Sequence, residues 1–299
     1  RQGMGQFAGR RAKKVSFQFI LRRYNFSCTL KESTAKGTAM TNTHETARKF
    51  NFLYRIIKFF VWLFYPRTEV VGAGNLPAEP AIIVGNHSKM NGPIACELYF
   101  PGKRYIWCAA EMMSVREVPA YAFRDFWSHK PAWCRWWFRL LSYIIAPFSS
   151  CIFNNAGTIA VYRDRRIVHT FHESEARLAE GASVIIFPEH DVPYNNIICQ
   201  FQDGFVDVAR MYYKKTGREL DFVPLYVAPA LKKMYIGKPV RFDASAPIKE
   251  EKERICRLLA EEITDIARRL PPHRVVPYQN IPKKDYPVNT QICEEGAGK

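Results

Sequence analysis

The chain has 299 residues, a formal net charge of +16 at neutral pH, and shares of 47% hydrophobic and 14% aromatic residues. Its length allows one domain with a sizeable core, and its charge implies an anionic partner: nucleic acid, anionic lipid headgroups or acidic substrates. Eight cysteines scattered without a CxxC pair exclude a secreted disulfide scaffold and a zinc ribbon, and they fit reduced thiols in a cytosolic compartment.

Residues 1–39 are expected to be a basic leader. They carry nine basic residues against the single acid Glu32, about half of the net charge, and Met40 then opens a stretch that reads like the start of a protein. We expect the leader to be non-native or disordered. An over-extended gene prediction is the favoured source, and a basic targeting arm similar to a transit peptide is the alternative. The remaining charge, without a nucleic-acid motif, argues against nucleic acid as a partner.

Residues 50–65 are almost continuously apolar and aromatic, interrupted by Arg55 and Lys58. The run falls short of the roughly 20 apolar residues that cross a bilayer. Basic residues and Trp62 suit a helix that lies in the headgroup region instead. We therefore expect an N-terminal membrane-interfacial amphipathic helix within residues 40–67, and the alternative is a helix packed in the core.

Residues 131–146 form a second aromatic and basic stretch, which contains Trp133, Arg135, Trp136, Trp137 and Arg139. Arginine stems can reach toward water while indole rings occupy the membrane interface. The two stretches together predict a monotopic, membrane-associated protein at the cytoplasmic face, with membrane lipids as partners. Core packing of the same aromatic residues is the alternative.

Short apolar runs alternate with helical patterns along the rest of the chain. The predicted strands cover residues 81–84, 105–109, 159–162, 183–187, 222–227 and 240–242, and the predicted helices cover residues 93–99, 166–179, 205–215 and 255–270. This alternation predicts an α/β fold with a mixed, largely parallel sheet flanked by helices. Because no repeat or linker divides the chain, we expect one domain over residues 68–280 and an extended tail over residues 281–299.

His87 directly follows the predicted strand over residues 81–84, after Gly85 and Asn86. The carboxyl ends of strands are where α/β sheets usually carry their sites. A histidine there can take a proton from a hydroxyl group at neutral pH once another group fixes its tautomer. On position alone, a structural histidine is the commoner case.

Three later segments place further groups at or near strand ends. They are Gly157 to Arg163, Phe187-Pro188-Glu189, and Val223-Pro224. Arg163 ends a predicted strand, where its guanidinium can bind a phosphate in a bidentate manner. Glu189 puts a carboxylate directly after another strand.

Taken in order from Asn86-His87 onward, these segments resemble the four motifs of the glycerol-phosphate and lysophosphatidic acid acyltransferase family, over roughly residues 68–275. The resemblance implies transfer of a fatty acyl group from acyl-CoA or acyl-carrier protein to a phosphate-bearing glycerol or lysophospholipid acceptor, by default lysophosphatidate. It implies neither a metal nor a redox cofactor. It implies that His87 is the general base, that Arg163 holds the acceptor phosphate and that Glu189 binds or orients the acceptor. Asn86, Pro188 and Gly157 would also contribute to substrate binding.

The chain departs from the family motifs at three places. An aspartate follows the histidine by five positions in the family, where this chain has Gly92, and Lys89 stands where the motif has serine. The family also commonly continues after Glu189 with glycine, where this chain has His190. Asn91 is a candidate to orient His87 through its side-chain carbonyl, and its alternative role is the capped start of a helix. Two other functions stay open: a catalytically impaired, lipid-binding membrane scaffold, and an acyl thioester or ester hydrolase.

Overall fold

The computed structural model describes residues 52–128 and 130–291, so the predicted leader over residues 1–39 lies outside the described residues. Its main sheet has eight strands in the order β1-β9-β8-β2-β5-β3-β4, with β10 paired to β8, and a separate two-stranded sheet joins β6 and β7. The strands are β1 (Glu69–Val71), β2 (Ile82–Gly85), β3 (Arg104–Ala109), β4 (Thr158–Val161), β5 (Ser183–Ile186), β6 (Glu189–Pro193), β7 (Cys199–Phe201), β8 (Asp221–Ala228), β9 (Lys233–Ile236) and β10 (Val240–Arg241).

The predicted fold class is confirmed, because the sheet is mixed and largely parallel. Strand β8 is antiparallel to β9 and β10, whereas the other pairs in the main sheet are parallel. All six predicted strands form. The short strands β1 and β9 and the β6–β7 hairpin were not predicted, because their residues mix polar and apolar side chains and do not form the short continuous apolar run that marks a buried strand.

Helices cover both faces of the sheet, which explains why its central strands are continuously apolar. On one face, side chains such as Ile82 and Val84 pack against α6 (Ile167–Ala179), α7 (Val206–Thr216) and α8 (Ile248–Arg269). On the other face, side chains such as Ile83 and Leu225 pack against α3 (Asn91–Tyr99). The four predicted helices in this part of the chain are therefore confirmed, with ends that differ by a few residues.

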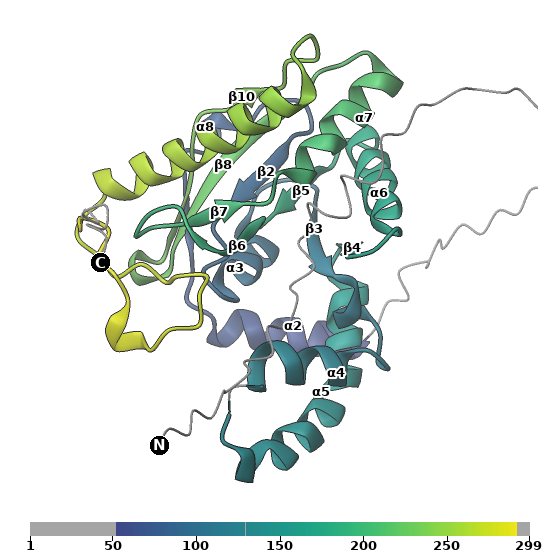
Figure 1. The fold of residues 1–299 in the computed structure, drawn as a ribbon, viewed down its shortest axis with the longest axis vertical. Coiled ribbons are helices and arrows are strands. Elements are labelled where there is room, and N and C mark those ends of the chain that lie inside the picture. The colour runs from purple at the N-terminus through teal and green to yellow at the C-terminus, as the bar shows by residue number, and fades with distance from the viewer. Residues whose placement is uncertain (1–51, 129, 292–299) are drawn as a thin grey trace, which may run out of the picture.

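A group of helices gathers at one end of the molecule, at the bottom of Figure 1: α2 (Phe52–Phe64), α4 (Val118–Ala122) and α5 (Arg135–Asn155). A short π-helix (Phe123–Trp127) follows α4. Helix α5 extends beyond the predicted residues 131–146, because Pro147 lies inside the helix rather than ending it. In the described part of the chain, residues 132–155 make the one helix that is long and apolar enough to cross a bilayer, and only 17% of its apolar window is buried.

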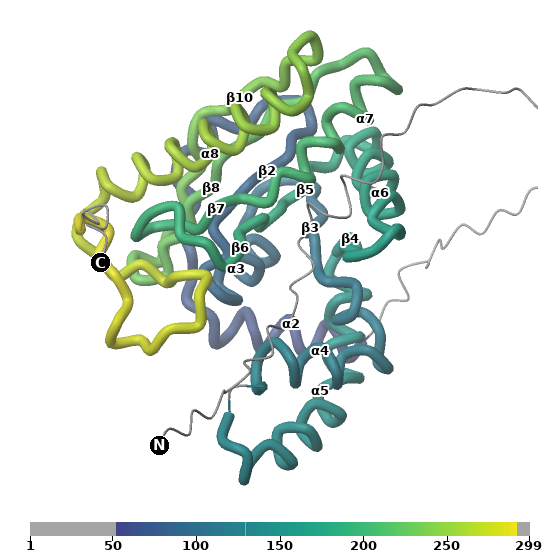
Figure 2. Tube along the Cα trace, in the orientation of Figure 1, coloured from purple at the N-terminus to yellow at the C-terminus, as the bar shows by residue number. Residues whose placement is uncertain are grey.

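Residues 271–291, which we call the C-terminal strap, fold back onto the domain. Figure 2 shows them as a yellow loop below the β6–β7 hairpin. The strap is fixed by Asn289, which is fully buried, donates hydrogen bonds to the carbonyls of Ala267 (2.8 Å) and Leu270 (3.1 Å) and accepts one from the His273 N–H (2.8 Å). The prediction of an extended tail from residue 281 is therefore wrong for residues 281–291, because one buried asparagine ties this polar segment to the end of α8.

Candidate functional site

The ends of β2 and β5 lie side by side in the sheet, and they bring His87 and Glu189 together. The carboxylate of Glu189 is buried and accepts two backbone hydrogen bonds, from the N–H of His87 at 2.5 Å and from the N–H of Cys199 at 3.0 Å. Burial raises the pKa of Glu189 to about 7, and the two backbone bonds act against that rise. This carboxylate therefore holds the main chain at His87, and its role in binding or orienting the acceptor stays a prediction.

The His87 imidazole contacts two aromatic rings. Phe187 is edge-on at 5.5 Å between centroids, with an interplanar angle of 66°, and Tyr278 of the C-terminal strap is edge-on at 5.8 Å and 75°. Among the described residues, the buried Nδ1 atom of His87 has no hydrogen-bond partner of regular geometry. Burial lowers the pKa of His87 below 6.5, although the backbone at Lys89 and at His87 itself raises it. The imidazole is therefore neutral at neutral pH, the state that a general base requires.

The backbone turns sharply directly after His87. Ser88 (φ 46°) and Lys89 (φ 57°) both adopt left-handed conformations, which non-glycine residues rarely take. The buried hydroxyl of Ser88 donates to the carbonyl of Val276 at 3.3 Å, which ties the turn to the strap. Strained backbone of this kind clusters at functional sites and persists only where surrounding bonds enforce it.

Asn86 and Pro188, both predicted to bind substrate, belong to the framework of the site. The buried side chain of Asn86 donates to the carbonyl of Val227 at 3.0 Å and accepts the N–H of Val227 at 2.7 Å, so it joins the ends of β2 and β8. Pro188 is buried, and its carbonyl accepts the N–H of Gln202 at 2.9 Å. These two residues shape the site without presenting polar groups to a ligand.

Asn91, the predicted partner of His87, is the first residue of α3, whose N-cap is Met90 and which has no side-chain cap, so the alternative role of Asn91 holds only for its place at the helix start. Its side-chain amide donates to the carbonyl of Ser88 at 2.9 Å, and its own carbonyls receive the hydroxyl of Tyr65 at 3.2 and 3.5 Å. Its side chain is thus occupied away from the imidazole. At Gly92, a Cβ atom would lie 2.8 Å from the carbonyl oxygens of Asn86 and His87 and 2.8 Å from the Phe187 ring. The missing aspartate therefore corresponds to a position without room for a side chain.

Gly157 and Arg163 lie at opposite ends of β4. Gly157 (φ 62°) forms the turn that precedes the strand, so it is at the edge of the sheet away from His87, contrary to its predicted role in substrate binding. Arg163 follows the carboxyl end, at the same edge as His87. Its side chain is 61% exposed and lies 4.0 Å from the carboxylate of Asp125, which leaves the guanidinium accessible. Its charge also reaches the site, because it lowers the pKa of Tyr278 against the larger effect of burial, which raises that pKa.

The chain matches no protein-family model and no curated protein. Among solved structures, it is similar to the 1-acyl-sn-glycerophosphate (LPA) acyltransferase, PlsC, from Thermotoga maritima, with 20% identity, a TM-score of 0.41, and coverage of 78% of this chain and 86% of that one.

Two features of the site were not predicted from the sequence. They are the contact of Phe187 with the His87 imidazole and the presence of Tyr278 beside it. Phe187 was visible only as part of a motif, and Tyr278 lies about 190 residues from His87. One signal could have pointed to the strap. The apolar pair Val275-Val276 follows the helix-ending Pro271-Pro272 after only His273 and Arg274, which indicates a segment that returns to the core, and Val275 is indeed buried.

The chemistry available at this edge rests on a neutral imidazole and an exposed guanidinium. In the described residues, no group of three or more His, Cys, Asp or Glu side chains is arranged to hold a metal ion. Burial raises the pKa values of the Cys96 and Cys108 thiols to about 12, so both are protonated at neutral pH. His87 can therefore accept a proton from a bound hydroxyl group, and Arg163 can pair with an anion.

Proposed function

We propose that this protein is an O-acyltransferase that moves a fatty acyl group from acyl-CoA or acyl-carrier protein to a phosphate-bearing glycerol or lysophospholipid acceptor. The observation that carries the proposal is the neutral, half-buried imidazole of His87 at the carboxyl end of β2, with an accessible Arg163 along the same edge of the sheet. Lysophosphatidate is the default acceptor, because it combines a free hydroxyl, a phosphate and an acyl chain.

The reaction needs one proton carrier. His87 takes the proton from the acceptor hydroxyl as that oxygen attacks the carbonyl carbon of the thioester. The tetrahedral intermediate then collapses, the carbon–sulfur bond breaks, and the leaving thiolate takes the proton from the imidazolium. Arg163 pairs with the acceptor phosphate and fixes the hydroxyl near the imidazole, which turns the attack into a reaction between positioned groups.

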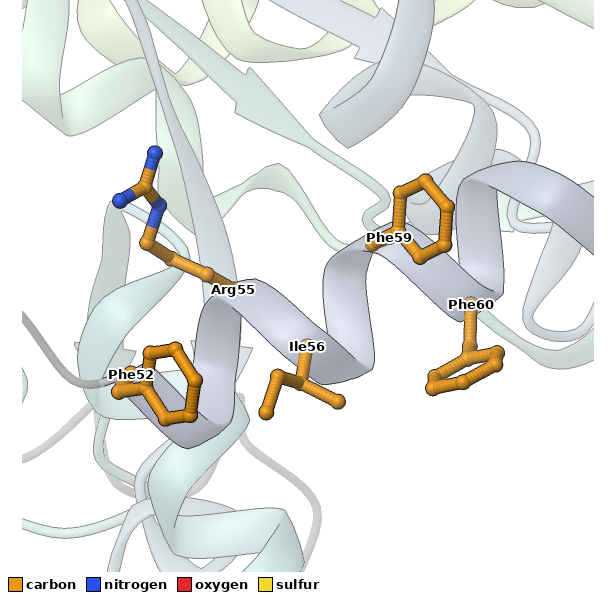
Figure 3. Close-up of a pocket in the computed structure, with 5 residues that line it drawn as sticks. All are labelled: Phe52, Arg55, Ile56, Phe59 and Phe60. Atoms are coloured by element: carbon orange, nitrogen blue, oxygen red, sulfur yellow. The ribbon is translucent and has the colours of Figure 1, made fainter.

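The exposed faces of α2 and α5 support a membrane surface as the place of reaction. On α5 and just before it, Trp133 and Trp136 are 79% and 67% exposed. On α2, Figure 3 shows Phe52, Ile56 and Phe60 projecting from one side of the helix, with Arg55 directed away from them. Apolar surface of this extent marks an interaction site, and aromatic residues beside basic ones suit the lipid headgroup region.

Helix α2 is also hydrogen-bonded to α3, the helix that follows His87 in the chain. Tyr54 and Lys58 of α2 contact the Glu97 carboxylate of α3 at 2.9 and 2.6 Å. The first turn of α3 packs against the carbonyl of His87, because the N–H of Gly92 donates to it at 3.1 Å. A protein that lies on a membrane through α2 would therefore present His87 at a fixed height above the lipids.

The test is donor thiol release by the full chain on phosphatidylcholine vesicles, with and without lysophosphatidate, for wild type and His87→Ala. The proposal predicts release that depends on the acceptor and is lost in His87→Ala. Release that is independent of the acceptor would replace the transferase by a hydrolase, in which His87 activates water. Vesicle binding without release in either form would replace it by a lipid-binding scaffold.

A further inference from the structure

The two rings beside His87 hold it in the same way. Both meet the imidazole edge-on rather than face-on, at interplanar angles of 66° for Phe187 and 75° for Tyr278. Edge-to-face contact is a favoured geometry for aromatic pairs. The buried Nδ1 atom lacks a regular hydrogen bond within the described residues, so these two rings and the backbone at Lys89 are the contacts that restrict rotation of the imidazole.

Phe187 owes its position to two glycines. A Cβ atom on Gly85 would lie 3.0 Å from Cε1 of Phe187, and one on Gly92 would lie 2.8 Å from the same atom. The ring therefore fills the space that side chains at these positions would take. An acid at position 92 and a phenyl ring against the imidazole exclude each other in this packing.

Tyr278 owes its position to the C-terminal strap. The strap is attached on both sides of it, since the Ser88 hydroxyl donates to the carbonyl of Val276 and the Gln279 amide donates to the carbonyl of Asp191 at 2.8 Å. Both attachments lie within two residues of Tyr278. They bring its ring to 5.8 Å from the imidazole although it is distant in the sequence.

We propose that Phe187 and Tyr278 are the positioning residues of His87, an aromatic clamp that orients the imidazole in place of an acidic side chain at position 92. The inference rests on the proposed function for the role of His87 as a base, but the clamp itself is a statement about how the ring is held. It acts by steric restriction and by exclusion of water, and it transfers no proton. The strap is accordingly part of the site rather than a tail.

The charged groups around the clamp are known. The Glu189 carboxylate binds the backbone N–H of His87, and the charges of Asp191, Glu189, Arg163 and Asp125 act on the Tyr278 ring. The substitutions that test the clamp leave these four groups in place. A change in the behaviour of the imidazole can then be attributed to the lost ring.

The test follows the His87 imidazole by NMR in the full chain with isotope-labelled histidine, the signal being assigned by its loss in His87→Gln. We expect the pKa of His87 to rise toward 6.5 in Tyr278→Leu and Phe187→Leu, because water reaches the ring. Tyr278→Phe, which restores the ring without the hydroxyl, recovers most of the wild-type value. Tyr213→Leu, on the exposed face of α7, is the matched control and leaves the His87 signal in place.

Turnover supplies the second readout. In Tyr278→Leu, kcat falls by at least about tenfold while the donor KM stays within about threefold, because misorientation of a base affects the chemical step. If Phe187→Leu does not fold, the Tyr278 variants decide. An unchanged pKa of His87 and an unchanged kcat in Tyr278→Leu would overturn the clamp. A shifted imidazole in a protein that transfers no acyl group would keep the clamp and overturn the proposed function.

Discussion

The carboxylate of Glu189 accepts the backbone N–H of His87 at 2.5 Å, so the strand end that carries the imidazole is held by the strand end beside it. The same carboxylate accepts the N–H of Cys199, which joins the β6–β7 hairpin to this contact. One buried acid thus connects three segments around the site. Burial removes this carboxylate from water and raises its pKa, so the stability of the site depends on pH.

The pH dependence of folding should change in Glu189→Gln. The folded pKa of Glu189, about 7, lies above its ordinary 4.5, so its contribution to stability is full below pH 4.5 and is lost as the pH rises through 7. We expect the advantage of wild type over Glu189→Gln in unfolding free energy to shrink between pH 5 and pH 8, by at most about 3 kcal/mol. Urea unfolding of both proteins at pH 5 and pH 8 measures this difference. The titration of His87 contributes equally to both proteins, because both contain it. A constant difference would contradict the burial of this carboxylate.

Acyl transfer should persist below pH 6.5. The base has to be neutral, and burial keeps the pKa of His87 below its ordinary value. Activity is therefore present above that lowered pKa and disappears only as the pH falls through it. The pH profile of kcat/KM on vesicles measures the acidic limb, and a midpoint at or above pH 6.5 would show that the base is another group or is solvated.

A side chain at position 92 should destabilise the fold. Because a Cβ atom there would lie 2.8 Å from two carbonyl oxygens and a phenyl ring, Gly92→Ala should cost about 1–3 kcal/mol of unfolding free energy, and Gly92→Asp at least as much without a gain in activity. Gly74→Ala is the control, since no atom lies within 4 Å of a Cβ placed there. Equal unfolding curves for the two alanine variants would contradict the packing around Phe187.

The phosphate of the acceptor should be recognised through Arg163. Loss of a charge-assisted contact predicts a rise in acceptor KM of about 10-fold to 100-fold in Arg163→Gln. Arg166→Gln is the control on the same loop, because Arg166 already pairs with Asp164 at 2.9 Å. Kinetics with lysophosphatidate and with monoacylglycerol separate the phosphate from the rest of the acceptor. A similar rise for both acceptors would exclude a specific phosphate contact.

Vesicle binding should depend on the aromatic face. Because Trp136 and Trp137 are exposed, Trp136→Ser with Trp137→Ser should weaken vesicle binding by at least about tenfold and leave the melting temperature unchanged. Flotation with phosphatidylcholine and phosphatidylglycerol vesicles measures the loss. Tyr213→Ser, on the distant α7, is the control. Full binding by the double variant would mean that these indoles face another partner.

The sequence predicts the parts of this protein that depend on local pattern. The central strands are apolar runs bounded by polar residues, and α8 shows a regular apolar spacing, so both could be found without a structure. The roles that depend on where a side chain points could not be predicted from the sequence. Whether Glu189 points to a ligand or to the N–H of His87 depends on the β6–β7 hairpin, which supplies the second bond to its carboxylate. The contact between Tyr278 and His87 depends on the bonds that hold Val276 and Gln279 of the strap.

The most direct test of the account is the mass-spectrometric yield of acylated lysophosphatidate on vesicles, for wild type, His87→Gln and the control His190→Gln. His190 is adjacent to Glu189 but is not part of the strand end that carries the imidazole. The account predicts product from wild type and His190→Gln, and a yield from His87→Gln at least about a hundredfold lower. Product formed equally by His87→Gln would contradict it.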